Sequence, residues 1–326
     1  MQTMKEEFYL PSSCEGIDLR GIMWQPEGEV KAILQISHGM AEHIERYDEF
    51  AMFLRDLGYC VVGHDHIGHG KTAKEKEERG HIDSKGGNQF LIEDMHLIRK
   101  KLAAMYPKAP YFMLGHSMGS TLLRQYILEY GEGLDGIILS GPVAKISKAL
   151  LSVGKCLAKA IGKIKGADYR SKLLYNMTLG SYSKQIKDDD VGSWVTKDKE
   201  KAKEYADDEL SDFIFTASGY YAVFDGIGRL HDKEASRKTP HDLPIYIVSG
   251  KEDPVGGFGE GVEKIHEEYK KDGAKNVDIT IYEEGRHEML NEVNRQEVYQ
   301  DIAYWMEKTI TLNLLEASLS ILDEDI

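Results

Sequence analysis

The segment YFMLGHSMGS, residues Tyr111–Ser120, places one serine between two glycines. The four residues before Gly115 are mostly apolar, as in a buried strand, and the residues after Ser117 repeat apolar side chains at the spacing of a helix. Gly115 and Gly119 have no Cβ, so the turn between strand and helix can be tighter than other residues would allow. The segment therefore predicts a sharp strand-to-helix turn that exposes Ser117.

Short apolar or β-branched runs alternate with amphipathic helical segments on both sides of this turn. We expect strands over residues 19–24, 32–39, 60–67, 111–115, 134–141, 243–250 and 277–285. We expect helices over residues 45–58, 88–106, 118–131, 261–273 and 294–310. This alternation is typical of a parallel sheet covered on both faces. The sequence therefore predicts an α/β fold with a mostly parallel, doubly wound central sheet.

The alternation is interrupted once, over residues 143–243, where the sequence becomes helical, lysine-rich and irregular. Because this block lies between two predicted strands of one sheet, we expect it to be an inserted helical cap. The core is then made of residues 1–142 and residues 244–310. Residues 311–326 form an acidic C-terminal extension, to which the sequence assigns no role.

The composition is that of a globular protein with an acidic surface. Of 326 residues, 55 are Asp or Glu and 41 are Lys or Arg, which gives a net charge of -14. This balance argues against a nucleic-acid partner, since binding phosphates requires clustered cations. Cys14, Cys60 and Cys156 form neither a metal motif nor a disulfide framework. With no signal-peptide pattern and no apolar run of the roughly 20 residues that span a bilayer, we expect a cytoplasmic protein.

Residues 115–119 match the G-x-S-x-G pattern of a nucleophilic serine. The predicted strand before the pattern and helix after it are the context that this chemistry requires. The alternative is that Ser117 only caps the helix that follows it and takes no part in catalysis. A serine hydroxyl is a weak nucleophile, so Ser117 needs a base, and the base needs an acid that orients it.

The last two predicted strands end in residues that supply both partners. Asp253 follows the first of them and His287 follows the second. Both lie on the edge of the sheet where Ser117 is exposed, so we predict Ser117, Asp253 and His287 as a catalytic triad. Glu252 is the alternative acid, but the residue before Pro254 is held extended, which suits a side chain directed from a strand end.

The other histidines have simpler explanations. The run HDHIGHG, residues 64–70, brings His64, His66 and His69 close together, and imidazole is a common zinc ligand. No further ligand cluster accompanies them and a serine triad needs no metal, so we expect a glycine-shaped loop, with neither a metal nor a cofactor. We expect His116 to be a packed neighbour of the serine rather than a second base.

Acyl transfer also needs donors for the oxyanion, usually two backbone N–H groups. We predict the N–H of Met118, at the start of the helix after the nucleophile, and the N–H of Met40, in the loop after the strand over residues 32–39. The methionine side chains would then be free to line an apolar acyl pocket. Ordinary core packing is the alternative for Met40.

The cap begins with a basic segment. Between Val143 and Gly166 there are six lysines and no acidic residue. On a helical projection one side carries Lys145, Lys148, Lys155, Lys159 and Lys163, and the other side carries Ile146, Leu150, Val153, Leu157, Ile161 and Ile164. Such a helix either packs its apolar side on the protein with its lysines in water, or lies over the active site and touches anionic lipid.

Four stretches of the chain resemble the α/β-hydrolase superfamily, and within it the monoacylglycerol lipase and lysophospholipase group, sometimes classed with serine aminopeptidases. They are SHGMAEHIERYDEFAMFLRDLGYCVVGHDHIGHGKT (residues 37–72), LGHSMGS (114–120), SGKEDPVG (249–256) and EGRHEMLNE (284–292). The resemblance implies the α/β-hydrolase fold, the triad Ser117, Asp253 and His287, and an oxyanion hole from the N–H groups of Met40 and Met118. The cap is the least similar region, so the resemblance does not indicate the preferred acyl chain.

From these observations we expect a serine hydrolase that cleaves carboxylic esters through an acyl-enzyme. The expected substrate is a small acyl ester or lipid, a monoacylglycerol or lysophospholipid. A short-chain carboxylesterase is the nearest alternative. An aminopeptidase would need an acidic cluster in the cap, for which residues 188–190 or Asp207 with Asp208 are candidates. A non-catalytic binding protein would usually lack a member of the triad.

Overall fold

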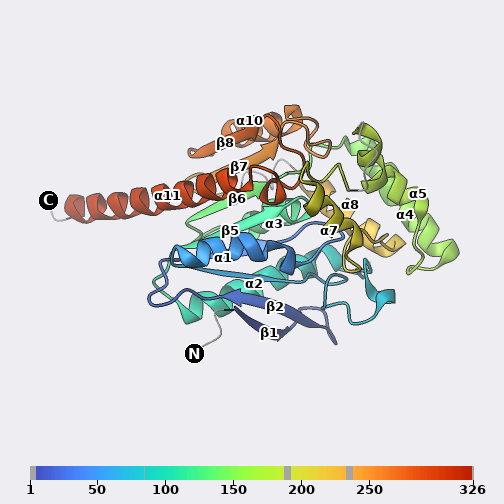
Figure 1. Ribbon diagram of the computed structural model, residues 1–326, viewed down its shortest axis with the longest axis horizontal. Helices are drawn as coiled ribbons and strands as arrows, with labels where there is room; N and C mark the ends of the chain where they lie inside the picture. The colour runs from blue at the N-terminus through green and yellow to red at the C-terminus, as the bar shows by residue number, and fades with distance from the viewer. Residues whose placement is uncertain (1–4, 84, 187–191, 233–237, 325–326) are drawn as a thin grey trace.

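The structure, a computed structural model, describes residues 5–83, 85–186, 192–232 and 238–324 (Figure 1). Its centre is an eight-stranded sheet in the order β1-β2-β4-β3-β5-β6-β7-β8. The strands are β1 (Lys5–Pro11), β2 (Asp18–Trp24), β3 (Ala32–Ser37), β4 (Tyr59–His64), β5 (Tyr111–His116), β6 (Gly136–Ser140), β7 (Ile245–Gly250) and β8 (Val277–Tyr282). Strands β3 to β8 are parallel, and β1 and β2 add an antiparallel edge. The predicted α/β-hydrolase fold is confirmed.

The edge strand β1 was not predicted, because KEEFYLP begins with charged residues and its side chains are exposed or only half-buried. It pairs with β2 in a register that sets Phe8 opposite Gly21. The Phe8 ring covers Gly21 so closely that a Cβ there would overlap it. This packing over a glycine depends on pairing between strands, which a pattern along one segment does not reveal.

In the described part of the chain, five α-helices cover the two faces of the sheet. They are α1 (Asp48–Asp56), α2 (Gly87–Met105), α3 (Met118–Tyr130), α10 (Glu260–Lys271) and α11 (Arg295–Glu324). Because side chains alternate along a strand, β5 contributes Met113 to the core beneath α2, α3 and α10, and Leu114 to the core beneath α1 and α11. Both faces are therefore apolar, and the strands read as continuous buried runs.

Among the residues that the structure describes between β6 and β7, five more stretches are α-helical. They are α4 (Lys148–Lys165), α5 (Lys172–Met177), α6 (Leu179–Tyr182), α7 (Lys199–Asp207) and α8 (Ala217–Arg229). Figure 1 shows α4 and α5 at one end of the long axis of the molecule, with α8 between them and the sheet. Among the described residues, no helix is both long and apolar enough to cross a membrane.

The buried face of α4 differs from the predicted one. Leu151, Gly154 and Ala158 are buried, and Gly154 lies against the ring of Phe224 on α8. Because the two helices approach closely, small residues occupy the contact, and hydrophobicity alone does not identify them. Three residues of the predicted apolar side are instead exposed: Leu150 by 54%, Val153 by 57% and Ile164 by 81%.

The predicted lysine side of α4 is also divided. Lys155 points toward α8 and donates to Asp225 at 2.6 Å, and Lys145 pairs with Glu268 on α10. Lys159 and Lys163 are exposed. The outer surface of α4 therefore presents both lysines and large apolar side chains to solvent.

Helix α11 is longer than predicted. The sequence pattern places its end near residue 310, whereas the structure continues it to Glu324. Its first half packs on the sheet through Val298, Tyr299 and Ile302. Figure 1 shows the second half leaving the body at the end opposite α4 and α5.

Candidate active site

Ser117 occupies the turn between β5 and α3, and its backbone is strained. Its φ of +52° and ψ of −116° lie where residues with a Cβ rarely occur. Its N–H donates to the carbonyl oxygen of Ser140 at 3.0 Å. A Cβ on Gly119 would overlap the carbonyl oxygen of Ser37, and a Cβ on Gly115 would overlap the backbone of Gly119. The two glycines therefore allow α3 to begin directly against β3.

Asp253 and His287 follow β7 and β8, and their side chains meet. His287 Nδ1 lies 3.0 Å from Asp253 Oδ2, and Asp253 Oδ1 accepts the N–H of Val255 at 2.8 Å. Both side chains are buried. The ring of His287 lies 4.7 Å from that of His116, which directly precedes Ser117. The structure thus brings the predicted acid and base together beside the predicted nucleophile, at the carboxyl ends of parallel strands.

The alternative acid does not reach the histidine. Glu252 accepts a hydrogen bond from Lys197 Nζ at 2.7 Å, and its side chain is 44% exposed. The geometry therefore favours Asp253 for contact with His287.

The surroundings shift the pKa values of the two neighbouring histidines in opposite directions. Burial opposes a charge on His287, but the negative charges of Asp253, Glu288 and Glu42 outweigh it and raise its pKa. Burial and the nearby His287 lower the pKa of His116 to about 3, so His116 stays neutral. His287 is therefore the ring that can gain and return a proton near neutral pH.

The predicted oxyanion donors flank Ser117. Met40 and Met118 both line the same cavity as Ser117. The loop that carries Met40 is anchored, because the N–H of Gly39 donates to the carboxylate of Glu42. Ala41, the next residue, has a φ of +56°. This strained, anchored loop can hold a backbone N–H in a fixed direction.

A buried charged cluster joins that loop to the His287 loop. Arg46 donates to both carboxylate oxygens of Glu288 at 2.6 Å and to Glu42 at 3.0 Å, and its guanidinium lies over the ring of Tyr205. Burial alone would raise the pKa of Glu288, but the charge and hydrogen bonds of Arg46 hold it well below its usual range. Tyr47 donates to Glu42 at 2.9 Å. The cluster fixes the loop that carries Met40 relative to His287.

Sequence reasoning missed this cluster. Arg46 and Glu288 are 242 residues apart, so no local pattern pairs them. Two weak signals were present: Glu42 and Arg46 are spaced by four residues, and Glu288 directly follows His287.

Four buried histidines lie in or next to the loop that carries Met40. His38 Nε2 accepts the N–H of His66 at 3.0 Å, and its Nδ1 donates to the carbonyl oxygen of Gly39 at 2.8 Å. His66 Nε2 lies 3.0 Å from Ser37 Oγ. Burial lowers the pKa of all four, His38, His64, His66 and His69, so they are neutral. In the described ranges no group of three or more His, Cys, Asp or Glu is arranged to hold a metal ion.

An apolar cavity opens above Ser117. Its volume is about 70 Å³, and it extends between the core and the helices that follow β6. The apolar lining side chains are Met40, Leu91, Met118, Leu122, Val143, Ile146, Leu179, Val223, Phe224, Ile227 and Val255. Asn88, Thr121, Thr178 and Tyr182 are the polar ones. Such a lining favours a hydrocarbon chain next to the reacting group.

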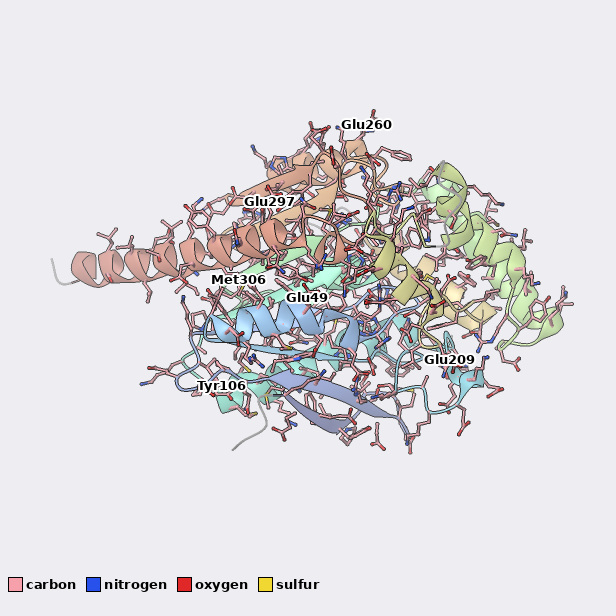
Figure 2. All side chains as sticks on the ribbon, viewed as in Figure 1. Glu49, Tyr106, Glu209, Glu260, Glu297 and Met306 are labelled. Carbon is pink, nitrogen blue, oxygen red and sulfur yellow. The ribbon has the colours of Figure 1, made fainter. Side chains whose placement is uncertain are left out.

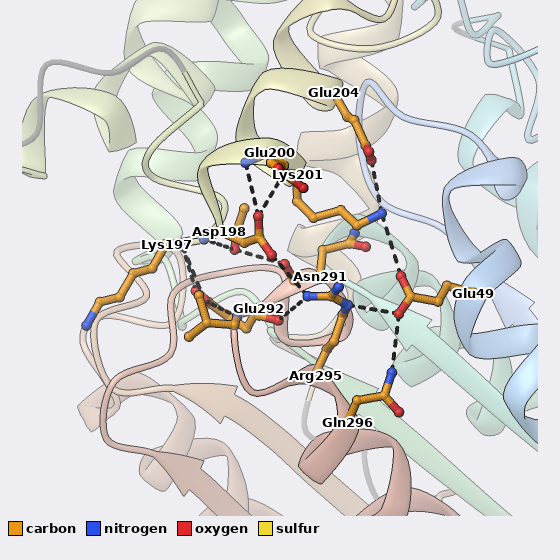
Figure 3. A network of polar contacts seen from close by, with 12 residues as sticks. Glu49, Lys197, Asp198, Glu200, Lys201, Glu204, Asn291, Glu292, Arg295 and Gln296 are labelled. Carbon is orange, nitrogen blue, oxygen red and sulfur yellow. Dashed lines mark hydrogen bonds and ion pairs between the residues drawn. The ribbon is translucent and has the colours of Figure 1, made fainter.

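Part of the inserted segment is fastened to the His287 loop. Arg295 donates to the carboxylate of Glu49 at 2.9 Å and to that of Asp198 at 3.0 Å. Figure 3 shows its guanidinium between these two side chains. The buried carboxylate of Glu292 accepts the N–H of Lys197 at 3.1 Å. These contacts tie the start of α7 to α1 and α11.

Trp194 completes this attachment. Its ring stacks on His287 with centroids 5.3 Å apart and planes at 25°. The adjacent Val195 accepts the N–H of Glu288 at 2.7 Å. One side of the predicted catalytic imidazole is thus covered by a residue from the inserted segment, which shields it from water.

Comparison with known proteins identifies the family of this chain. The family model of serine aminopeptidases, S33, matches residues 28–294. The chain belongs to this family. The match begins before β3 and ends just before α11, so it includes Ser117, Asp253 and His287.

Two curated relatives are lipases. The chain is 25% identical over 287 residues to a monoacylglycerol lipase of Mycolicibacterium smegmatis, covering 87% of this chain and 91% of the relative. It is 32% identical over 163 residues to a monoglyceride lipase of Mus musculus, covering 50% of this chain and 49% of that one. Among solved structures, a thermostable carboxyl esterase from Bacillus coagulans in complex with glycerol aligns with a TM-score of 0.85 and 26% identity, covering 95% of this chain and 100% of that one. The predicted resemblance to monoacylglycerol lipases of the α/β-hydrolase superfamily is confirmed.

In this S33 family chain the structure pairs Asp253 with His287, places the His287 ring 4.7 Å from that of His116, which precedes Ser117, and lines one cavity with Met40, Ser117 and Met118. The catalytic roles of Ser117, Asp253 and His287, and of the Met40 and Met118 N–H groups, remain predictions that follow from position and chemistry. The supporting residues Glu42, Arg46 and Glu288 are additions from the structure.

Proposed function

We propose that the chain is a serine hydrolase of carboxylic esters that acts as a monoacylglycerol lipase. The observation that carries this proposal is the buried Asp253–His287 pair beside a strained Ser117 that lines an apolar cavity. The sequence relatives described above support the same substrate class. Membership of the S33 family supports serine chemistry of this kind.

The proposed reaction has two halves. Ser117 Oγ attacks the ester carbonyl carbon while His287 Nε2 takes the hydroxyl proton, and Asp253 stabilises the imidazolium. The N–H groups of Met40 and Met118 stabilise the oxyanion. Collapse of the intermediate breaks the ester C–O bond as His287 returns the proton to the leaving alcohol. Water, activated by His287, then releases the fatty acid and regenerates Ser117.

The cavity supports an acyl substrate but limits its size in this conformation. Its volume of about 70 Å³ does not hold a long hydrocarbon chain. Phe224 of α8 and Ile146, just before α4, line the cavity, so these two helices would have to move apart to admit one. A short-chain carboxylesterase is therefore the second candidate, favoured by this small volume.

The peptidase alternative has less support. Residues 188–190 lie outside the described residues. Asp207 pairs with Lys203 on the surface of α7, and Asp208 binds His43 at 2.7 Å and the Ser211 hydroxyl at 2.6 Å. Both carboxylates are already engaged, so neither is free to hold a substrate amine.

A panel of model substrates tests the proposal. Esters of 4-nitrophenol with rising acyl length, 1-monoacylglycerols and aminoacyl 4-nitroanilides are assayed with wild type and Ser117→Ala. We expect ester and monoacylglycerol hydrolysis that Ser117→Ala abolishes, and no anilide hydrolysis. Activity confined to the shortest esters would select the carboxylesterase, and anilide hydrolysis alone would refute the proposal.

We also propose that α4 contacts anionic membranes from the cytoplasmic side and delivers substrate. The support is the exposed mixture of Leu150, Val153 and Ile164 with Lys159 and Lys163 on this helix. An apolar strip with flanking cations binds such surfaces through both hydrophobic and electrostatic terms.

Cosedimentation with anionic vesicles tests the membrane contact. The variant Lys159→Glu/Lys163→Glu should bind vesicles less than wild type does. Lys264→Glu/Lys270→Glu, two exposed lysines of α10, makes the same charge change elsewhere and is the matched control. Equal binding by all three proteins would contradict the proposal.

A further inference from the structure

The last turns of α11 form an apolar helix with no described element against their outer side. The side chain of Asn313 donates a 3.3 Å hydrogen bond to Asp135 and ties this part of the helix to the body. Figure 2 labels Met306 where the helix still lies over the sheet, and beyond it the helix leaves the body. Four large side chains in this part are exposed: Leu312 by 48%, Leu314 by 64%, Leu315 by 55% and Leu319 by 61%.

The spacing of these residues is that of a helix-pairing seam. Leu312, Leu315 and Leu319 are separated by three and four residues. This is the a/d repeat with which one helix packs along another. A short helix without tertiary packing is marginal in water, so a partner along the seam would stabilise this part of α11.

The arrangement of charge and shape disfavours a membrane as that partner. After Lys308 the chain contains four acidic residues and no lysine or arginine. An anionic surface would repel such a segment. The segment also projects from the end of the molecule opposite α4 and α5, so it is directed away from a membrane that those helices would touch (Figure 1).

We propose that the seam pairs with the same seam of a second copy of this chain, in antiparallel orientation. A seam of identical helices is self-complementary about a twofold axis, which is the usual geometry of homodimers. Parallel pairing would set the two acidic ends side by side. Antiparallel pairing sets each acidic end against the part of the partner's α11 that leaves the body, near which Lys108 and Lys308 are exposed.

A hollow beside this part of α11 can receive the end of the partner helix. It has a volume of about 440 Å³ and lies between α11 and the loop after α2. Ile310 and Leu314 line it from α11, Tyr106 and Lys108 line it from the loop, and Asp135 is its one acidic lining residue. A stable dimer buries about 800 Å² per partner, more than a short leucine seam alone supplies, so the hollow extends the proposed interface.

Sedimentation of the full chain tests the dimer. Wild type should sediment as a dimer at micromolar concentration, and Leu315→Glu/Leu319→Glu should dissociate at least a hundredfold more readily. Glutamate and leucine have similar helix propensities, so the helix itself is retained, and circular dichroism checks this. Leu150→Glu/Leu173→Glu makes the same change at two exposed leucines of the cap and should remain dimeric.

A charge variant tests the orientation. Lys108→Glu/Lys308→Glu should weaken the dimer about tenfold at low salt, with a smaller effect at high salt. A dimer unaffected by this change would overturn the antiparallel arrangement. Wild type that is monomeric up to high concentration, or a Leu315→Glu/Leu319→Glu variant that is still dimeric, would overturn the proposal.

Discussion

The substitution Glu288→Gln removes one charge from the buried cluster that joins the loop carrying Met40 to His287. In the wild type both carboxylate oxygens of Glu288 accept from Arg46 at 2.6 Å. Glutamine keeps the size of the side chain but offers one acceptor and no charge. The change therefore isolates the electrostatic contribution of Glu288 from its packing.

The expected loss of stability follows from the surroundings of Arg46. Removing one partner of a buried ion pair costs about 3–5 kcal/mol, because the remaining charge is left uncompensated. Here Glu42 stays within 3.0 Å of Arg46, so we expect the lower end, about 3 kcal/mol of unfolding free energy. That is a large part of the roughly 5–15 kcal/mol by which domains are stable. Denaturant unfolding at pH 7 measures it.

The pH dependence has a definite sign. The folded pKa of Glu288 lies below its ordinary value of 4.5, so its stabilisation is fully present above that value and is lost as pH falls toward the folded pKa. The difference in unfolding free energy between wild type and Glu288→Gln should therefore shrink as pH falls below about 4.5. Glu297→Gln, on the exposed surface of α11, is the matched control and should change little.

Activity gives a second readout from the same variant. The negative charge of Glu288 helps to raise the pKa of His287. His287 must be neutral to accept the serine proton, so wild-type kcat/KM falls as pH drops through that pKa. In Glu288→Gln the acidic limb of the profile should move to lower pH. Destabilisation below about 1 kcal/mol together with an unmoved acidic limb would show that the charge of Glu288 neither stabilises the fold nor raises the pKa of His287.

Three further changes have distinct expected outcomes. Gly119→Ala forces a Cβ into the carbonyl oxygen of Ser37, so it should reduce the unfolding free energy by about 1–3 kcal/mol and also reduce ester hydrolysis. A variant of wild-type stability would show that the close packing of Gly119 on Ser37 is not needed. Asp253→Asn should lower kcat about 10⁴-fold with the fold retained, as seen by circular dichroism, and a loss under tenfold would remove Asp253 from the triad. Arg295→Ala breaks the contacts to Glu49 and Asp198 shown in Figure 3, so amide hydrogen exchange in α7 should quicken, and unchanged exchange would show that this anchor is not needed.

Local patterns were sufficient for much of the fold. Strand β5 and helix α3 were predictable because four apolar residues precede a glycine-flanked serine and helical spacing follows. Asp253 and His287 were predictable because parallel strands deliver the residues after them to one edge of the sheet. In both cases the determining interaction lies within one segment or follows from the fold class.

The remaining features depend on contacts between distant segments. The buried side of α4 was not predictable, because close approach to Phe224 selects Gly154 over larger residues nearby. The pairing of Arg46 with Glu288 likewise needs the folded chain. The stacking of Trp194 on His287 joins the inserted segment to the site, and no spacing along the chain encodes it.

The central claim is that Ser117 is the nucleophile activated by His287 and Asp253. The most direct measurement is labelling with a fluorophosphonate, followed by mass spectrometry of the digested protein. We expect one modified residue, Ser117, with labelling abolished in Ser117→Ala and ester turnover reduced on the order of a million-fold in that variant. Label on a different residue, or a folded Ser117→Ala protein that still hydrolyses esters at the wild-type rate, would contradict it.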